Sequence, residues 1–198
     1  METKNNIQAV QAKTRSHWRK WLEENHEMET AVWLIMYNKA SATESINYEE
    51  AVEEALCFGW VDSKAIKRDD ESRYQYFAKR KPKSNWSKPN KLRVERLTNL
   101  GLMTPSGQKL IDLAKATGTW DALNDVDNNV VPADLQLLFN NNDEAFNNFE
   151  AFSNSSKCII LEWIQAARRP ETREKRIEET VELAAKNIRA HFPINEKK

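Results

Sequence analysis

The residues best suited to chemistry lie in a basic stretch from Lys79 to Lys91, where six of thirteen residues are Lys or Arg and none is acidic. Arg80 has the planar fork that binds a phosphate through two hydrogen bonds, and Lys83 supplies a point charge. Trp86 has an aromatic face on which a nucleobase would stack. The other candidate side chains are Lys79, Ser84, Ser87, Asn90 and Lys91. This composition favours a surface that binds a polyanion, with a nucleic acid as the best candidate.

Other interpretations of this basic stretch stay open. It is also typical of a solvated cationic turn that keeps the edge of a hairpin from aggregating. Trp86 would then anchor the turn to the core instead of contacting a ligand. A Trp among lysines also suits an anionic membrane surface.

The charge distribution agrees with a cationic surface. The formal net charge is zero, with 30 basic and 30 acidic residues. Residues 64–96, however, hold twelve Lys and Arg against four Asp and Glu. We therefore expect one cationic face around the basic stretch.

Catalytic motifs are missing from the sequence. It has no nucleophile elbow, phosphate-binding glycine loop or metalloprotease helix motif. The three histidines, His17, His26 and His191, are scattered, and Cys57 and Cys158 lack the spacing of metal ligands. We predict no catalytic residues, no metal, no cofactor and no enzymatic activity.

The N-terminal sequence and the lengths of the apolar runs predict where the protein is located. No apolar signal region follows Met1, and the longest apolar run, residues 31–37, is far too short to span a membrane. We expect a cytoplasmic protein without a transmembrane segment, with both cysteines as buried thiols in a reducing compartment.

Four further charged residues are secondary candidates. Asp62 lies in apolar company, where a carboxyl group either has a shifted pKa or, as we favour, has a structural role. Arg169, Arg173 and Arg176 share one face of the last predicted helix. They either bind an anion or, as we favour, clamp the acidic segment 121–127.

The elements that position these residues follow from periodicity and capping signals. Residues 31–37 are apolar on both alternating faces, which predicts a central strand. Asn47 and Glu50 form a capping box, and Ser87 and Thr104-Pro105 begin further helices. The full set is helices at 16–26, 47–59, 87–101, 104–118, 133–139, 143–152, 155–168 and 171–191, with strands at 31–37, 60–66 and 73–79.

This order predicts an α+β protein with a small mixed or antiparallel sheet and helices on its faces, followed by an all-helical module. We expect an α+β body over residues 1–120, an Asn-rich and acidic linker over 121–130, and a helical C-terminal module over 131–198.

Several segments together resemble the YdeI/OmpD-associated, or bacteriocin-protection, family of bacterial proteins. They are Ala55–Asp62 (ALCFGWVD), Arg80–Asn90 (RKPKSNWSKPN), Gly101–Gly107 (GLMTPSG), Val131–Leu135 (VPADL) and Ala167–Arg173 (ARRPETR). The first half also looks like the YjbR/CyaY-like superfamily, which is α+β and has proposed DNA-binding members. The resemblance implies a role in tolerating bacteriocins or cationic peptides.

We therefore expect a non-enzymatic protection protein that binds a polyanion through the basic stretch. The alternatives are a protein–protein interaction module that acts through the C-terminal helices, and binding to an anionic membrane surface.

Overall fold

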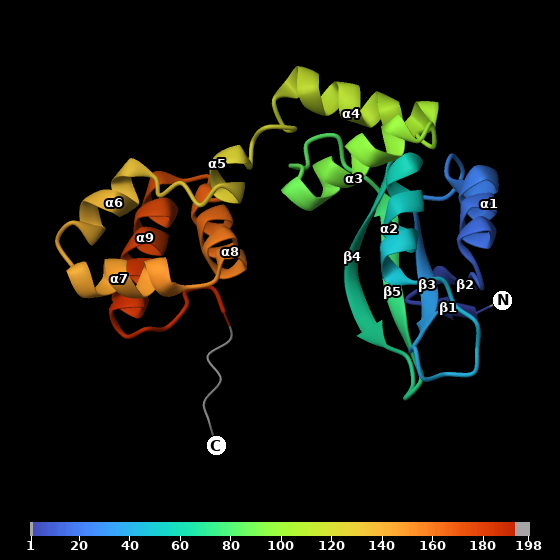
Figure 1. The fold of residues 1–198 in the computed structure, drawn as a ribbon, viewed down its shortest axis with the longest axis horizontal. Helices are drawn as coiled ribbons and strands as arrows, with labels where there is room; N and C mark the ends of the chain where they lie inside the picture. The colour runs from blue at the N-terminus through green and yellow to red at the C-terminus, as the bar shows by residue number, and fades with distance from the viewer. Residues whose placement is uncertain (1, 193–198) are drawn as a thin grey trace. The chain divides into compact units, whose positions relative to one another are not determined.

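The computed structural model describes residues 2–192, which form five strands and nine helices (Figure 1). They divide into two compact units, Met1–Asp121 and Ala122–Lys198. The first unit contains the sheet and the second is helical, so the α+β class predicted from the sequence is confirmed.

The sheet of the first unit has the strand order β1-β2-β3-β5-β4. Its strands are β1 (Glu2–Lys4), β2 (Ile7–Gln11), β3 (Ala31–Tyr37), β4 (Trp60–Lys67) and β5 (Ser72–Lys79). The β2–β3 pair is parallel and the others are antiparallel. The strand at residues 31–37 is confirmed, and it is central because strands flank it on both sides.

Strands β1 and β2 lie where the sequence predicts no element. β1 has only three residues, and β2 is partly exposed along most of its length, so hydrophobic periodicity is weak in both. The available signal was Asn5-Asn6, a pair of turn residues between two short runs. Both have a positive φ, 53° and 61°, and such a turn matches the twist of a tight antiparallel hairpin.

The helices of the first unit are α1 (Arg15–Asn25), α2 (Tyr48–Cys57), α3 (Lys88–Asn99) and α4 (Pro105–Thr117). Their local signals agree with the sequence. Asn47 and Glu50 form the capping box of α2, and the Thr104 side chain accepts from the Gly107 N–H at the start of α4. Helix α4 ends at Gly118, whose φ of 76° is a conformation that glycine tolerates best.

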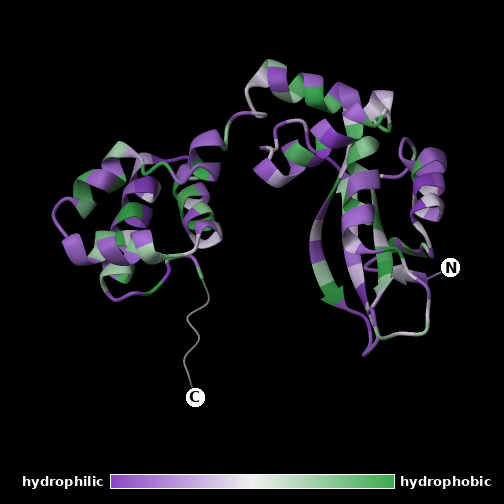
Figure 2. Cartoon of the chain, viewed as in Figure 1, coloured by the Kyte–Doolittle hydropathy of each residue, from purple (hydrophilic) through white to green (hydrophobic). Residues whose placement is uncertain are grey.

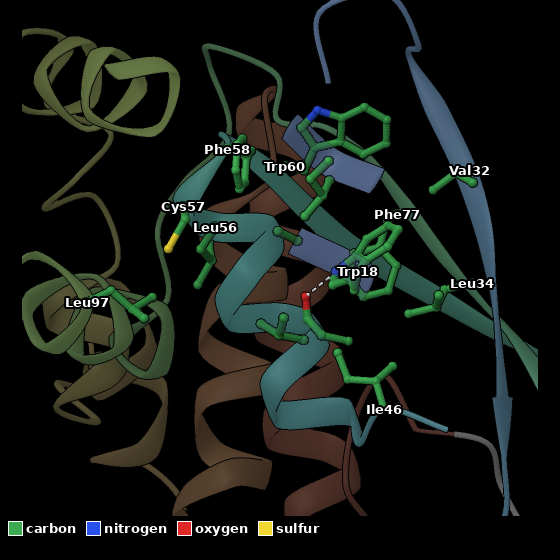
Figure 3. Packing of buried hydrophobic residues seen from close by; sticks show 14 of the residues in the cluster. Trp18, Val32, Leu34, Ile46, Leu56, Cys57, Phe58, Trp60, Phe77 and Leu97 are labelled. Atoms are coloured by element: carbon green, nitrogen blue, oxygen red, sulfur yellow. Dashed lines mark hydrogen bonds between the residues drawn. The ribbon is translucent and has the colours of Figure 1, made fainter. Parts of the chain in front are cut away.

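The main core of the first unit lies between α2 and the sheet. Leu56 of α2, Leu34 of β3 and Phe77 of β5 belong to it, together with Trp18 of α1 (Figure 3). The Trp18 Nε1–H donates to the Ala51 carbonyl at 3.0 Å, which satisfies a polar group that would otherwise be costly to bury. This core fixes the end of β5, where the basic stretch begins.

The second unit contains α5 (Asn124–Asp127), α6 (Ala133–Phe139), α7 (Asp143–Ala151), α8 (Asn154–Gln165) and α9 (Pro170–Ala185). Hydrophilic and hydrophobic residues alternate around these helices, as expected where each buries one face (Figure 2). Their inner faces form a separate core around Leu135, Phe149 and Ile164.

Residues 121–130, the expected linker, contain α5. Leu123 and Val126 of this stretch are buried in the core of the second unit. The division between the units falls at its beginning, after Asp121.

Candidate functional site

The basic loop, residues 79–91, connects β5 to α3 (Figure 1). Hydrogen bonds hold its backbone to distant segments. The Arg80 N–H donates to the Gly59 carbonyl at 3.0 Å, and the Trp86 N–H donates to the Thr119 carbonyl at 3.3 Å. The Ser84 N–H and hydroxyl both donate to the Lys81 carbonyl, which closes a turn at the tip. The loop is therefore held in one conformation.

Arg80 and Trp86 are buried, which corrects the roles predicted for them. Trp86 is 2% exposed and packs on Trp120 with a ring-centroid distance of 5.1 Å. The Arg80 guanidinium lies over the Trp86 ring at 3.7 Å, and its Nη2 donates to the Asn85 carbonyl. Trp86 has no free face for a nucleobase or a lipid headgroup, and its core contacts agree with the alternative in which it anchors the loop.

The exposed cations of the loop are Lys79, Lys81, Lys83 and Lys88. The Lys79 Nζ donates to the Glu27 carbonyl at 2.8 Å. Within residues 2–192, Lys81, Lys83 and Lys88 have no carboxylate within 4.0 Å. The positive charge of these three lysines is therefore not offset by a neighbouring carboxylate.

The remaining predicted loop residues have local contacts. Ser87 precedes the first residue of α3, but its hydroxyl makes no capping hydrogen bond. The Asn90 Oδ1 accepts from the Arg93 Nη1 at 2.9 Å. Lys91 is only partly exposed, and its N–H donates to the Ser87 carbonyl. These residues stabilise the start of α3, and they place no further charge at the tip of the loop.

The cationic face is narrower than the count over residues 64–96 suggests, because several of those cations are paired. Arg68 pairs with Glu2, and Arg93 with Glu49. Arg96 pairs with the buried Glu53. The unpaired positive charge is therefore concentrated on the loop.

Asp62 is only partly buried. It accepts a hydrogen bond from the Tyr48 hydroxyl at 2.8 Å, which joins the start of α2 to β4. Burial and this carboxylate raise the pKa of Tyr48 to about 12.

The arginines of α9 make contacts within the second unit, but their partner differs from the one predicted. Arg173 donates from Nε and Nη2 to the two carboxylate oxygens of Asp134, at 2.6 and 2.9 Å. Arg176 donates to the Trp163 carbonyl and lies over its ring at 5.0 Å. The clamped acid is thus Asp134 on α6 and not the segment 121–127. Arg169 is exposed at the start of α9.

Because Arg173 and Arg176 are occupied, they offer no free arginine surface to a protein partner. The alternative function, a protein–protein interaction module that acts through the C-terminal helices, therefore gains no support from these two arginines.

The Asp134–Arg173 contact gives a pH-dependent prediction. Hydrogen bonds from Arg173 lower the pKa of Asp134. A carboxyl group whose pKa is lowered in the folded state stabilises the fold above its unfolded pKa of about 3.9, and the stabilisation is lost as the pH falls through the folded value. Asp134→Asn should therefore lower the melting temperature of the second unit near neutral pH and have less effect at an acidic pH below the lowered pKa of Asp134, where the carboxyl group is protonated in both states. NMR amide signals of α9 followed during heating measure this.

The control is Glu179→Gln, which changes an exposed carboxylate of α9. A melting-temperature difference for Asp134→Asn that is the same at both pH values would contradict the ion-pair interpretation.

The two cysteines differ in how far they are buried. Cys57 is buried as predicted, and burial raises its pKa to about 11. Cys158 is only partly buried, contrary to the prediction, and its Sγ lies 3.3 Å from the Val126 carbonyl oxygen.

Across residues 2–192, no three His, Cys, Asp or Glu side chains are grouped as a metal site would require. No helix in that range is long and apolar enough to cross a membrane.

Comparison with known proteins divides the chain in two. Residues 128–187 match the family model described as "Bacteriocin-protection, YdeI or OmpD-Associated", which supports the resemblance drawn from the sequence for that part. The resemblance of the first half to the YjbR/CyaY-like superfamily is not supported, because residues 10–110 match a different model. No curated protein and no solved structure matches the chain. Since the model matched by residues 10–110 covers just over half of the 198 residues, the chain belongs to the family described as "Domain of unknown function (DUF8412)".

Proposed function

We propose that this chain is a bacteriocin-protection-type protein whose first unit binds a polyanion, with a nucleic acid as the ligand, through the exposed lysines of the basic loop. The observation that carries the proposal is the placement of Lys81, Lys83 and Lys88, exposed and without carboxylate partners among residues 2–192. Their loop is held at both ends by backbone hydrogen bonds. A preorganised loop loses little conformational entropy on binding.

The burial of Trp86 determines which kind of polyanion binding is supported. Without a free aromatic face, the loop offers neither base stacking nor an apolar anchor for a bilayer. What remains is attraction between lysines and phosphates, which is independent of sequence and falls with salt as counterions are released. For three lysines, the slope of log K against log salt on duplex DNA should be about −3.

The test is the triple variant Lys81→Glu, Lys83→Glu, Lys88→Glu. We expect it to weaken binding to a labelled DNA or RNA duplex at least about tenfold at low salt, because each substitution replaces an attraction with a repulsion. Fluorescence anisotropy measures binding, and the melting temperature should stay close to that of the wild type, since all three side chains are exposed.

The matched control reverses the same number of charges elsewhere, with Lys13→Glu, Lys39→Glu and Lys175→Glu, all exposed. Equal losses in both triple variants would mean that only net charge matters, and the loop would not be a site. Binding to vesicles of anionic phospholipid but not to nucleic acid would overturn the choice of ligand.

A further inference from the structure

Arg80 also lines a cavity of about 300 Å³ in the first unit, next to the base of the basic loop. Three other polar side chains line it: Lys79, which precedes Arg80, His26 at the end of α1, and Ser106 of α4. Phe58, Trp60 and Leu110 supply apolar walls. The cavity therefore combines one buried cation, further hydrogen-bonding groups and an apolar surface, which is typical of small-molecule sites.

The state of Arg80 is unusual for a buried arginine. It is 7% exposed, and no carboxylate lies within 4.0 Å of it among residues 2–192. Its guanidinium has five N–H groups, yet in this part of the chain it makes one hydrogen bond, to the Asn85 carbonyl. The Nε is buried without an acceptor.

Two other arginines of the first unit do have a carboxylate partner. Arg15 and Arg19 both pair with the buried Glu54. Burying a charge without a partner is costly, and most buried arginines are paired for this reason. Burial alone lowers the pKa of Arg80 to about 10, because no anion offsets the desolvation. One carboxylate does line the cavity, that of Glu27, but its side chain is 80% exposed and it makes no ion pair with Arg80. Within residues 2–192, Arg80 therefore lacks an anionic partner.

The neighbouring side chains His26 and Ser106 are held in place by their own hydrogen bonds. The His26 Nδ1 lies 2.8 Å from the Leu22 carbonyl oxygen and its Nε2 lies 3.0 Å from the Ser106 hydroxyl. Ser106 lies in the first turn of α4, where backbone N–H groups lack partners within the helix and favour negative charge. The Trp86 ring stacks on the guanidinium and restricts its orientation.

We infer that this cavity binds a small organic anion, whose phosphate or carboxylate group pairs with Arg80 and whose apolar part lies against Phe58 and Trp60. The site is distinct from the three lysines that carry the proposed function, because Lys81, Lys83 and Lys88 do not line the cavity. It would make the first unit a receptor for a small acidic metabolite in addition to a polyanion.

Isothermal titration calorimetry of the full chain with three probes tests this site: inorganic phosphate, phenyl phosphate and benzoate. We expect phenyl phosphate or benzoate to bind with a Kd of about 1 mM or tighter, a weak affinity suited to a fragment of this size. Whichever of these two probes has the lower Kd shows whether the site prefers a phosphate or a carboxylate group. Inorganic phosphate should bind more weakly than phenyl phosphate, because it lacks the apolar part.

The variant Arg80→Gln should weaken the best probe at least about tenfold, the loss of one charge-assisted contact. The matched control is Lys83→Gln, which removes one positive charge from the same loop outside the cavity and should change the Kd less than twofold. If Arg80→Gln unfolds the first unit, His26→Gln combined with Ser106→Ala tests the same cavity without removing the contact on Trp86.

Three results would overturn the inference. They are no binding of any probe to the wild type at about 10 mM, equal losses in Arg80→Gln and Lys83→Gln, or full binding in the folded His26→Gln, Ser106→Ala variant. Duplex binding is measured separately on Arg80→Gln. Normal duplex binding with lost probe binding would separate this site from the lysine surface, so that either can fail alone.

Discussion

Replacing Trp86 with alanine should lower the free energy of unfolding of the first unit by about 3–5 kcal/mol, the usual cost of truncating a large buried aromatic side chain. Trp86 is 2% exposed, belongs to the main core and packs on Trp120. The substitution also removes the ring that stacks on Arg80, which would leave a buried guanidinium with less contact. Urea unfolding of the full chain, followed by circular dichroism, measures the change.

Two variants make this result specific. Trp86→Phe keeps an aromatic ring and should lose only part of the stability, whereas Leu100→Ala, at an exposed position, should stay within about 0.5 kcal/mol of the wild type. If Trp86→Ala kept the wild-type stability and lost only duplex binding, Trp86 would be a ligand-contacting residue and the account of a core anchor would be wrong.

Much of the fold could be predicted because its signals are local. The apolar run at residues 31–37, the Asn47–Glu50 capping box and the Thr104-Pro105 helix start each depend on residues close in sequence, and each is found in the structure. Strand β2 could not be found in this way. It pairs locally with the three-residue β1, and its other partner is β3, so part of the information that makes it a strand lies more than twenty residues further along the chain.

The candidate site was predicted less well, for the same reason. The composition of residues 79–91 correctly drew attention to the loop, but exposure depends on the segments that pack on it. Trp86 is covered because Thr119 and Trp120, more than thirty residues away in sequence, lie beside it. His26 and Ser106 likewise reach the cavity beside Arg80 from separate helices, with no shared motif to connect them.

Arg15, Arg19 and Arg96 of the first unit form a second charged group, in which two buried glutamates are the counterions. Glu53 and Glu54 of α2 are both buried, and they connect α2 to α1 and α3. Glu54 accepts from the Arg15 Nε at 2.5 Å and from the Arg19 Nη1 at 2.8 Å. Glu53 accepts from Arg15 at 2.9 Å and from Arg96.

Replacing Glu54 with glutamine should therefore destabilise the first unit by about 1–3 kcal/mol, because it replaces the buried carboxylate that accepts from Arg15 and Arg19, while each arginine keeps one other carboxylate, Glu53 or Glu23. The substitution keeps the size of the side chain, so the loss reports charge and not a cavity. One arginine nitrogen of this group, the Arg15 Nη2, is already buried without an acceptor.

The matched control is an exposed glutamate that pairs with one of the same arginines, Arg19. Glu23 pairs with the Arg19 Nε at 3.2 Å but is 53% exposed, whereas the Glu54 side chain is 2% exposed. Exposed pairs of this kind contribute about 0–1 kcal/mol, so Glu23→Gln should be nearly silent in the same urea titration. Equal effects of the two substitutions would show that the desolvation of Glu54 does not determine its contribution. A large difference would instead mean that burial decides the strength of these pairs, which is the physical basis for treating unpaired Arg80 as a site for an external anion.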